Sequence, residues 1–413
     1  MGTHVVSGRV GHVLASTGAA AALVLAAGSA APDAAAGAGS PNGAGTRTTG
    51  NEQCTFPAKP IRGTPWALQR VLLDQLWQDT RGRGVTVAVI DTGVDDSNDQ
   101  LRDAVDPDHG LDLIEKKGDG TNDLVGHGTK VAGIIAAREA EGTGFVGLAP
   151  EATIMPIRQN DGQRNGTASN MATAIRHAVD EGAGVINISQ DTTKPLRNDS
   201  VLAQAVQYAV QKDVVVVASA GNDGADGKAR NTYPAALPGV LAVGASDRNN
   251  ERATFSQAGE FVGVTAPGVD MVSTVPLGGH CVDNGTSFSA PYVAGVAALL
   301  RAKHPDWKNN EVIAQIQQTA QRTALGHDRF VGWGVVDPVK ALTEDDRPLP
   351  EPVPDTGLVK SSHEVVPRPL TLGETPQERK ERIAVYTVAA GGAGVALLVG
   401  GSVALRDWRR RKQ

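Results

Sequence analysis

The sequence predicts an α/β fold: a doubly wound, mostly parallel sheet with helices on both faces, followed by one C-terminal transmembrane helix. Three observations predict this class. Short apolar runs bounded by turn residues recur as expected strands, at 84–90, 152–157, 184–189, 214–218 and 240–243. Helical segments separate several of these runs, near 129–138, 166–181 and 198–211. Residues 383–405 contain no charged side chain, and a stretch of about 23 residues is long enough to cross a bilayer.

The chain before the sheet divides into three expected segments. Residues 1–31 are typical of a secretion signal, because a weakly basic start precedes a short apolar run that ends in small residues; a disordered Ala-rich tail is the alternative. Residues 32–50 are mostly Ala, Gly, Pro, Ser and Thr, which predicts disorder. Residues 51–81 carry Cys54 and leucines at helical spacing, which predicts a short amphipathic helix packed on the following domain.

The chain after the sheet is expected to form an anchor. The globular domain is assigned to residues 82–345, and the Pro-rich, polar segment 346–382 to a linker. The apolar span 383–405 is followed by the tail 406–413 with five basic residues, whereas three basic residues closely precede the span. This excess predicts a cytoplasmic tail and an extracellular domain at the cell membrane. The alternative is a buried helix of a soluble domain, which fits poorly because no domain is expected around it.

Composition argues against several kinds of site. The formal net charge of −6 argues against nucleic-acid binding. The chain has two cysteines, Cys54 and Cys281, and no His stands at metal-ligand spacing to either. We therefore expect no zinc site and no cofactor, and no ligands for another metal can be assigned, which leaves calcium binding open. In an exported protein a single cysteine pair is typical of a disulfide, and two unrelated free thiols are the alternative.

Four polar residues stand where a parallel sheet places functional side chains. Asp91 ends the first apolar strand, and Asn222 follows the run at 214–218. His127 lies between two glycines at the start of a helix, where backbone can approach a ligand closely. Ser287 opens an apolar helix whose N–H groups can stabilise an anion. Taken singly, these residues also fit a turn Asp, a turn Asn, a structural His and a helix N-cap.

Three sequence blocks, in this order, resemble the subtilisin-like serine proteases. They are Ile90-Asp91-Thr92-Gly93, Gly126-His127-Gly128-Thr129 and Gly285-Thr286-Ser287-Phe288-Ser289-Ala290-Pro291. The resemblance covers roughly residues 82–342 and implies a serine endopeptidase that works through an acyl-enzyme intermediate. It assigns Ser287 as the nucleophile, His127 as its base and Asp91 as the carboxylate that orients the base. It also assigns Asn222 to the oxyanion hole.

One segment departs from the pattern of that family. By the resemblance, the chain from Ser189 onward lines the substrate cleft. Here it continues as Gln190-Asp191, where the family has glycines. The resemblance therefore leaves the specificity of the cleft open.

The order of the segments narrows the resemblance to the mycosins, which are membrane-anchored proteases associated with type VII secretion. A signal, a short extension with Cys and Trp, a subtilisin core, a Pro-rich linker and one apolar helix follow one another in that order. The two cysteines are fewer than mycosins commonly carry. The resemblance implies a protein or peptide substrate, membrane secretion-complex subunits as partners, and a single membrane span. The alternative is a mainly structural or docking role in the complex, with proteolysis secondary.

A second Asp-Thr-Gly sequence, at 355–357, suggests two further interpretations. Together with Asp91-Thr92-Gly93 it matches the signature of aspartic proteases, which need both copies in equivalent loops of two β lobes. The second copy lies instead in the expected linker. Residues 353–357 also resemble a cell-wall sorting signal, but the apolar span begins too far downstream for the usual arrangement.

Overall fold

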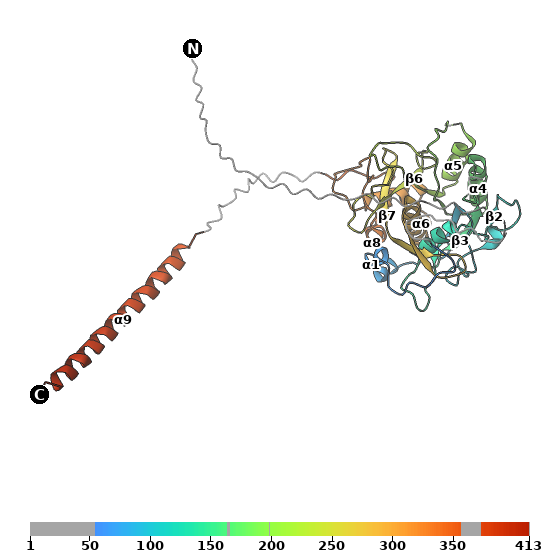
Figure 1. Ribbon diagram of the computed structural model, residues 1–413. Helices are drawn as coiled ribbons and strands as arrows, with labels where there is room; N and C mark the ends of the chain where they lie inside the picture. Colours follow the sequence, from blue (N-terminus) through green and yellow to red (C-terminus); the bar gives the residue numbers. More distant parts are fainter. Residues whose placement is uncertain (1–53, 163–165, 198, 357–372, 413) are drawn as a thin grey trace, which may run out of the picture. The chain divides into compact units, whose positions relative to one another are not determined.

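The structure, a computed structural model, describes residues 54–162, 166–197, 199–356 and 373–412. The expected signal peptide at 1–31 and the expected disordered segment at 32–50 lie outside these residues. The described chain forms an α/β domain and one long C-terminal helix (Figure 1).

Seven strands form a parallel sheet in the order β2-β3-β1-β4-β5-β6-β7. They are β1 Thr86–Asp91, β2 Leu111–Asp112, β3 Thr153–Arg158, β4 Val185–Ile188, β5 Val215–Ser219, β6 Val240–Ser246 and β7 Val262–Pro267. The chain winds outward in both directions from β1, which pairs with β3 on one side and β4 on the other. The predicted doubly wound sheet is therefore confirmed. The carboxyl ends of β1 and β4 meet at a switch point, where open α/β sheets place their sites.

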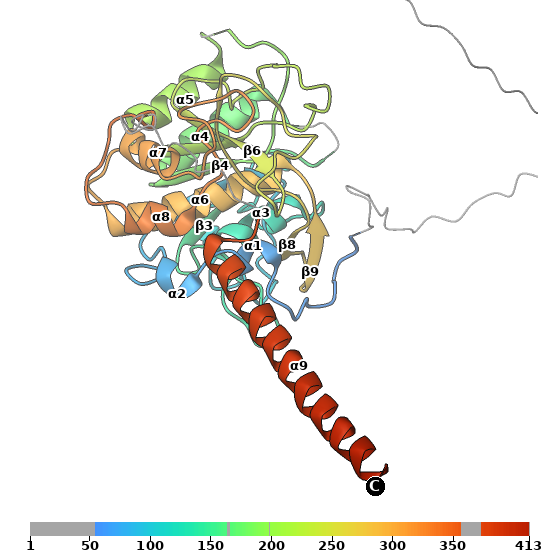
Figure 2. The same ribbon diagram turned by 90° about the vertical axis from the view of Figure 1, so that its left-hand side faces the viewer.

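Helices cover both faces of this sheet (Figure 2). The helices of the described residues, including the separate C-terminal helix, are α1 Trp66–Gln69, α2 Leu73–Leu76, the short 3-10 helix η1 Pro107–His109, α3 His127–Ala136, α4 Ala168–Asp180, α5 Val201–Gln211, α6 Thr286–Lys303, α7 Asn309–Gln318, α8 Pro338–Thr343 and α9 Pro376–Arg410. Successive strand residues point to opposite faces. Helices α4 and α5 share a buried cluster with Ala88 and Ile90 of β1, whereas α3 and α6 share one with Val87 and Val89.

Helix α6 runs through the interior of the domain. Of its 18 residues, 14 are buried, as expected for a helix that is apolar around its circumference. Small side chains let it approach its neighbours closely, since a Cβ added to Gly295 would lie 3.0 Å from Leu148 Cβ. An antiparallel hairpin of β8 Met271–Thr274 and β9 His280–Asp283 precedes this helix.

The extension forms two four-residue helices, α1 and α2, rather than the single amphipathic helix expected. Helices this short have no stability of their own. The Trp66 indole donates a hydrogen bond to the Val269 carbonyl (3.0 Å), and the Trp77 indole donates to the Leu148 carbonyl (2.8 Å). Contacts with the domain therefore decide the path of the extension, and the leucine spacing could not reveal them.

The first part of the expected linker contacts the domain near the end of α7. The Val353 N–H donates to the Gln318 side chain (2.7 Å). The Arg322 guanidinium donates two hydrogen bonds to the Asp355 carboxylate (2.9 and 3.0 Å). Residues 357–372 of the expected linker lie outside the described part of the chain.

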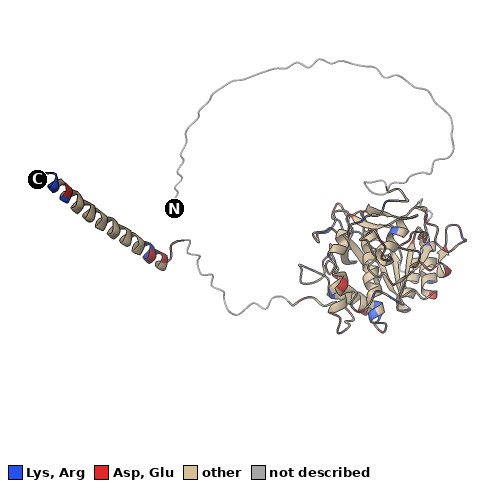
Figure 3. Ribbon diagram, turned by 90° about the horizontal axis from the view of Figure 1, so that it is seen from below, with Lys and Arg blue, Asp and Glu red and all other residues tan. Residues whose placement is uncertain are grey.

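Helix α9 contains the expected span 383–405 and extends beyond it at both ends. Thr375 and Glu378 form a reciprocal capping box, which begins the helix before the apolar stretch. None of its 35 residues is buried. The ribbon in Figure 3 is coloured for charged residues at both ends of α9 and for none along its middle. Its length and composition suffice to cross a membrane.

Candidate active site

Asp91 is the last residue of β1 and lies at the switch point of the sheet. Its side chain is fully buried. Its Oδ1 accepts hydrogen bonds from the Thr92 N–H (2.8 Å) and from His127 Nδ1 (2.7 Å). Its Oδ2 is buried without a hydrogen-bond partner among the described residues. The negative charge of this carboxylate therefore acts mainly on the imidazole beside it, where it favours the cationic form.

His127 is the first residue of α3, and flanking glycines let it reach Asp91. Gly126 has a φ of +80°, which L side chains rarely adopt. A Cβ added to Gly128 would lie 2.0 Å from the Gly93 carbonyl oxygen, so a larger residue would push α3 away from the loop after β1. The His127 side chain is 21% exposed, and its Nε2 has no hydrogen-bond partner in the described part of the chain. This nitrogen is therefore available to a ligand.

The surroundings of His127 suit it to accept a proton. Burial lowers the pKa of His127, but the charge of Asp91 and the hydrogen bond to it outweigh that effect, so the pKa is raised overall. Because Nδ1 donates to Asp91, the neutral ring has its lone pair on Nε2. The ring can therefore act as a general base through Nε2.

Asp123 supports this pair and was not identified from the sequence. It is buried, and its Oδ2 accepts from the Thr129 N–H (2.9 Å) and hydroxyl (2.6 Å). Its Oδ1 accepts from the Thr92 hydroxyl (2.8 Å). Burial raises the pKa of Asp123, although these hydrogen bonds oppose the rise. The carboxylate ties the loop after β1 to the first turn of α3, and an Asp shortly before the Gly-His-Gly turn was its one sequence signal.

Ser287 lies in the first turn of α6, beside the end of β4. Pro291 has no N–H, so the Ser287 carbonyl four residues earlier lacks its helical donor. The Ser189 hydroxyl donates to that carbonyl instead (2.8 Å). The His127 ring packs against the Phe288 ring, with centroids 5.4 Å apart. No hydrogen bond joins Ser287 to His127 among the described residues; such bonds are often long in free enzymes.

Asn222 follows β5, and the residue before Ser287 orients its side chain. Its Oδ1 accepts hydrogen bonds from the Thr286 N–H (2.9 Å) and hydroxyl (3.0 Å). Because the oxygen is occupied, the amide NH₂ group points elsewhere, and Nδ2 lies 3.5 Å from the position of a Cβ on Gly285. Asn222 is exposed, so this NH₂ group is free to donate to a bound oxyanion. All four residues singled out in the sequence lie at the carboxyl edge of the sheet.

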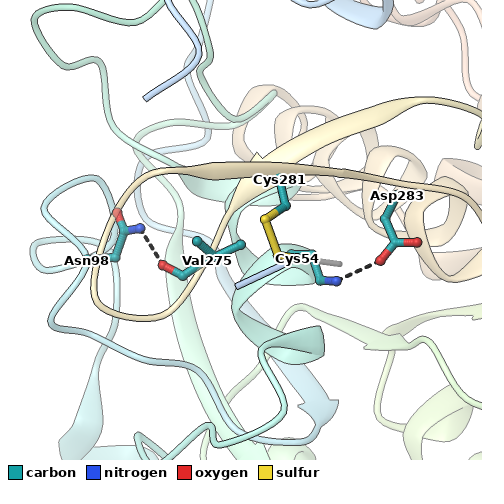
Figure 4. Close-up of a disulfide and its surroundings, with 6 residues drawn as sticks. Cys54, Asn98, Val275, Cys281 and Asp283 are labelled. Atoms are coloured by element: carbon teal, nitrogen blue, oxygen red, sulfur yellow. Dashed lines mark hydrogen bonds and ion pairs between the residues drawn. A yellow bond between two sulfur atoms is a disulfide. The ribbon is translucent and has the colours of Figure 1, made fainter. Parts of the chain in front are cut away.

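The two cysteines form a disulfide, so the free-thiol alternative is wrong (Figure 4). The Cα atoms of Cys54 and Cys281 are 5.8 Å apart. Because Cys281 belongs to β9, the bond joins the extension to the hairpin before α6. Nearby, Phe56 packs against the turn before the candidate base, since a Cβ on Gly126 would lie 3.0 Å from its ring. The extension is therefore a neighbour of the active site.

His280, next to the disulfide, is held in its neutral form. Its Nδ1 accepts from the Ile61 N–H (3.0 Å), and its Nε2 donates to Gln100 Oε1 (2.6 Å). Burial lowers the pKa of His280 to about 4. Protonating Nδ1 would break the bond from Ile61, so this contact between extension and hairpin depends on neutral imidazole.

Asp355, which begins the second Asp-Thr-Gly sequence, is not placed as in an aspartic protease. Asp355 forms an ion pair with Arg322 (2.9 Å), and the domain has one parallel sheet rather than two β lobes. The aspartic-protease interpretation is therefore wrong. Within the described ranges, no group of three or more His, Cys, Asp and Glu side chains could hold a metal ion.

Known proteins resemble the chain along most of its length. Residues 82–334 match the Subtilase family. Mycosin-1 of Mycolicibacterium smegmatis is 32% identical over 409 residues, which cover 87% of this chain and 88% of that protein. Mycosin-4 of Mycobacterium tuberculosis is 36% identical, and the match covers 82% of this chain and 81% of that protein.

Two solved structures share the fold. The MycP3 protease from the type VII (ESX-3) secretion system is 37% identical with a TM-score of 0.62, covering 70% of this chain and 92% of that one. A chain in the structure of an intact ESX-5 inner membrane complex is 34% identical with a TM-score of 0.63, covering 84% of this chain and 91% of that one. With this fold and these relatives, the chain belongs to the subtilase family of serine endopeptidases and, within it, groups with the mycosins.

Proposed function

We propose that Asp91, His127 and Ser287 are the catalytic triad with which this endopeptidase hydrolyses peptide bonds. The observation that carries the proposal is the 2.7 Å hydrogen bond between His127 Nδ1 and Asp91 Oδ1 at the switch point of the sheet. The same imidazole packs against the first turn of α6, which bears Ser287. Asp91 selects the tautomer whose Nε2 accepts a proton.

The reaction has two halves. Ser287 Oγ attacks the substrate carbonyl carbon while His127 Nε2 takes the hydroxyl proton. The C–N bond then breaks as His127 returns that proton to the leaving amine, which leaves an acyl-enzyme. A water molecule attacks the acyl carbonyl by the same route and regenerates Ser287. Asp91 stays ionised throughout and stabilises the imidazolium that forms in each half.

Asn222 and the backbone N–H of Ser287 stabilise the oxyanion that develops in both halves. The two hydrogen bonds from Thr286 hold the amide oxygen of Asn222, which leaves Nδ2 as the donor. Loss of one such donor costs about 3 kcal/mol of activation free energy. Asn222→Ala is therefore expected to lower kcat about a hundredfold and to change KM little.

A fluorophosphonate probe tests the nucleophile directly, because it bonds only to an activated serine. Mass spectrometry of the labelled chain is expected to find the adduct on Ser287. His127→Ala is expected to abolish labelling, since the hydroxyl then has no base. An adduct on another serine, or labelling of His127→Ala at the wild-type rate, would contradict the proposed triad.

The extension stays attached to the mature enzyme as a permanent part of it. The disulfide between Cys54 and Cys281 and the indole hydrogen bonds of Trp66 and Trp77 support this. Mass spectrometry of the exported, unreduced protein is expected to find the two cysteine peptides linked. Two alkylatable thiols, or a mature chain that begins after Trp77, would count against it.

Helix α9 anchors the enzyme in the cell membrane, with the peptidase domain outside and residues 406–413 in the cytoplasm. The unburied apolar surface of α9 supports a membrane span, and the larger number of basic residues after the span supports the orientation. Protease added to intact protoplasts is expected to release the peptidase domain and to spare a tag placed after Gln413. A cleaved tag, or full-length protein free in the medium, would exclude this topology.

The enzyme acts on protein or peptide substrates as a subunit of a type VII secretion complex. The similarity to a chain of the ESX-5 inner membrane complex extends over 84% of this chain and supports this role. Cells that carry Ser287→Ala are compared with cells that lack the protein. We expect both to lose secretion, because the complete triad favours proteolysis as the main role. Secretion that survives in Ser287→Ala cells and fails in the deletion would favour the structural, docking role instead.

A further inference from the structure

We propose that Asp191 makes this enzyme prefer a cationic side chain, Lys or Arg, in the substrate residue whose carbonyl is attacked. The inference rests on the proposed function, because Ser287 and Asn222 locate that substrate residue. It concerns the one cleft segment that departs from the family pattern, where Gln190-Asp191 follows Ser189.

Hydrogen bonds hold the residues on both sides of Asp191 in place. Two residues earlier, the Ser189 hydroxyl donates to the Ser287 carbonyl (2.8 Å). One residue later, Thr192 and Tyr233 exchange two backbone hydrogen bonds (3.0 and 2.9 Å). These bonds hold the segment between the nucleophile helix and the loop that contains Tyr233, so the position of Asp191 beside that helix is defined.

The Asp191 carboxylate lies against Gly221, the residue before the oxyanion donor. A Cβ added to Gly221 would lie 3.0 Å from Asp191 Oδ2 and 3.0 Å from Thr232 Cγ2. Gly221 also has a φ of +99°. Both the lack of space for a Cβ and this backbone conformation therefore favour glycine at position 221. The substrate carbonyl oxygen binds at Asn222, and the substrate side chain begins two bonds from that carbonyl carbon. A long side chain that extends past Gly221 therefore meets the Asp191 carboxylate.

No ion pair involves Asp191 in the described part of the chain, whereas Asp199 further along pairs with Arg197 (2.9 Å). The charged group that acts on Asp191 is Asp223, which has the same sign. Arg230, on the loop after Asp223, is engaged by the Asp226 carboxylate (3.1 Å). A carboxylate with a like charge beside it and no cation is stabilised strongly by a cationic ligand.

The protonation of Asp191 makes the preference depend on pH. Asp191 is exposed, but partial desolvation of its carboxylate by the surrounding protein, together with the charge of Asp223, raises its pKa to about 6. The carboxylate is ionised above that pH and neutral below it. The attraction for a cationic side chain is therefore expected to be full above pH about 7 and to fade as the pH falls through about 6.

The test uses the full-length enzyme in detergent and three fluorogenic peptides that differ only at the attacked residue. That residue is Lys, norleucine or Glu, and norleucine has nearly the length of Lys without its charge. The wild-type kcat/KM at pH 8 is expected to be about tenfold higher for Lys than for norleucine, as for one charge-assisted hydrogen bond, and lowest for Glu. Dividing the Lys value by the norleucine value removes the titration of His127, which both peptides share.

Two variants and a matched control assign the effect to one carboxylate. Asp191→Asn is expected to bring the Lys to norleucine ratio to about one at every pH. Asp191→Lys is expected to favour the Glu peptide. Asp199→Asn, which removes a carboxylate already paired with Arg197, is the control and is expected to leave the ratio unchanged.

The outcomes separate this inference from the proposed function. Equal rates for Lys and norleucine in the wild type, or the same ratio in the wild type and Asp191→Asn, would overturn the inference while hydrolysis of norleucine still supports the triad. A preference removed by Asp223→Asn and kept by Asp191→Asn would also overturn it. Failure of the wild type to cleave any of the peptides would count against the proposed function itself.

Discussion

Helices α6 and α9 both carry long apolar stretches, yet their environments in the structure are opposite. Helix α6 buries 14 of its 18 residues, whereas α9 buries none of its 35. An apolar helix needs an apolar environment, which α6 finds in the domain core and which a lipid bilayer would supply to α9 in the proposed topology. The apolar composition of each helix therefore predicts that it needs an apolar environment. The packing partners decide which environment that is.

The largest expected contrast between the two helices is catalytic. Ser287→Ala in α6 is expected to lower kcat by at least about 10⁴-fold, because the nucleophile is lost. Ser402→Ala in α9 is the matched control, since the Ser402 hydroxyl donates only to the Val399 carbonyl of its own helix (2.9 Å). Peptide hydrolysis by the two purified variants measures the difference. Wild-type activity in the Ser287→Ala protein would refute the assignment.

Introducing a charged residue into each helix is expected to have the next largest effect. Ala298 in α6 is fully buried, so Ala298→Asp is expected to destabilise the domain by about 5 kcal/mol or more and to prevent folding. Val395→Asp in α9 is expected to raise the free energy of membrane insertion by about 3 kcal/mol and to leave the domain folded. Protein yield and the membrane-bound fraction are measured. A lower melting temperature of the domain in Val395→Asp would mean that α9 packs on it.

Substitution of one glycine in each helix tests packing without introducing a charge. A Cβ on Gly295 of α6 would lie 3.0 Å from Leu148 Cβ, whereas a Cβ on Gly394 of α9 has no neighbour within 4 Å. Gly295→Leu is expected to reduce the free energy of unfolding by about 3 kcal/mol through overpacking. Gly394→Leu is expected to leave it unchanged. Urea unfolding of the domain measures both, and equal midpoints for the two variants would show that α6 tolerates a large side chain.

The smallest expected effect lies in the hairpin before α6, which has a pH-sensitive contact that α9 lacks. The pKa of His280 falls from 6.5 to about 4 on folding. Because the folded state disfavours the charged ring, its contribution to stability is complete above pH about 6.5 and is lost as the pH falls toward about 4. Allowing for residual solvent access, we expect a loss of about 2 kcal/mol.

Urea midpoints at pH 7 and pH 4.5 measure this effect in the wild type and in His280→Asn. The variant lacks the titrating ring, so its midpoint is expected to change less between the two pH values. A decrease as large as that of the wild type would assign the acid sensitivity to other groups.

The residues of the candidate site could be predicted where they belong to a local sequence motif. His127 stands between glycines because α3 must approach the loop after β1, and Ser287 stands at the start of a helix with a following Pro. These structural requirements constrain residues that are neighbours in the sequence, so they produce a recognisable sequence motif. Asp123 left almost no such pattern, because it lies outside the motifs that contain its partners Thr92 and Thr129, and folding joins it to them.

The sequence by itself determined the class of the parallel sheet, five of its seven strands (β2 and β7 were not predicted), and the presence of an apolar C-terminal helix, because side-chain periodicity and length are local properties. Only the tertiary structure decided that the extension forms two short helices, that Ser189 replaces the donor missing at Pro291, and that Asp191 lies against Gly221 with no ion pair to any described residue. These features join residues far apart in the chain. Their energies come from contacts that exist only after folding, so no local pattern records them.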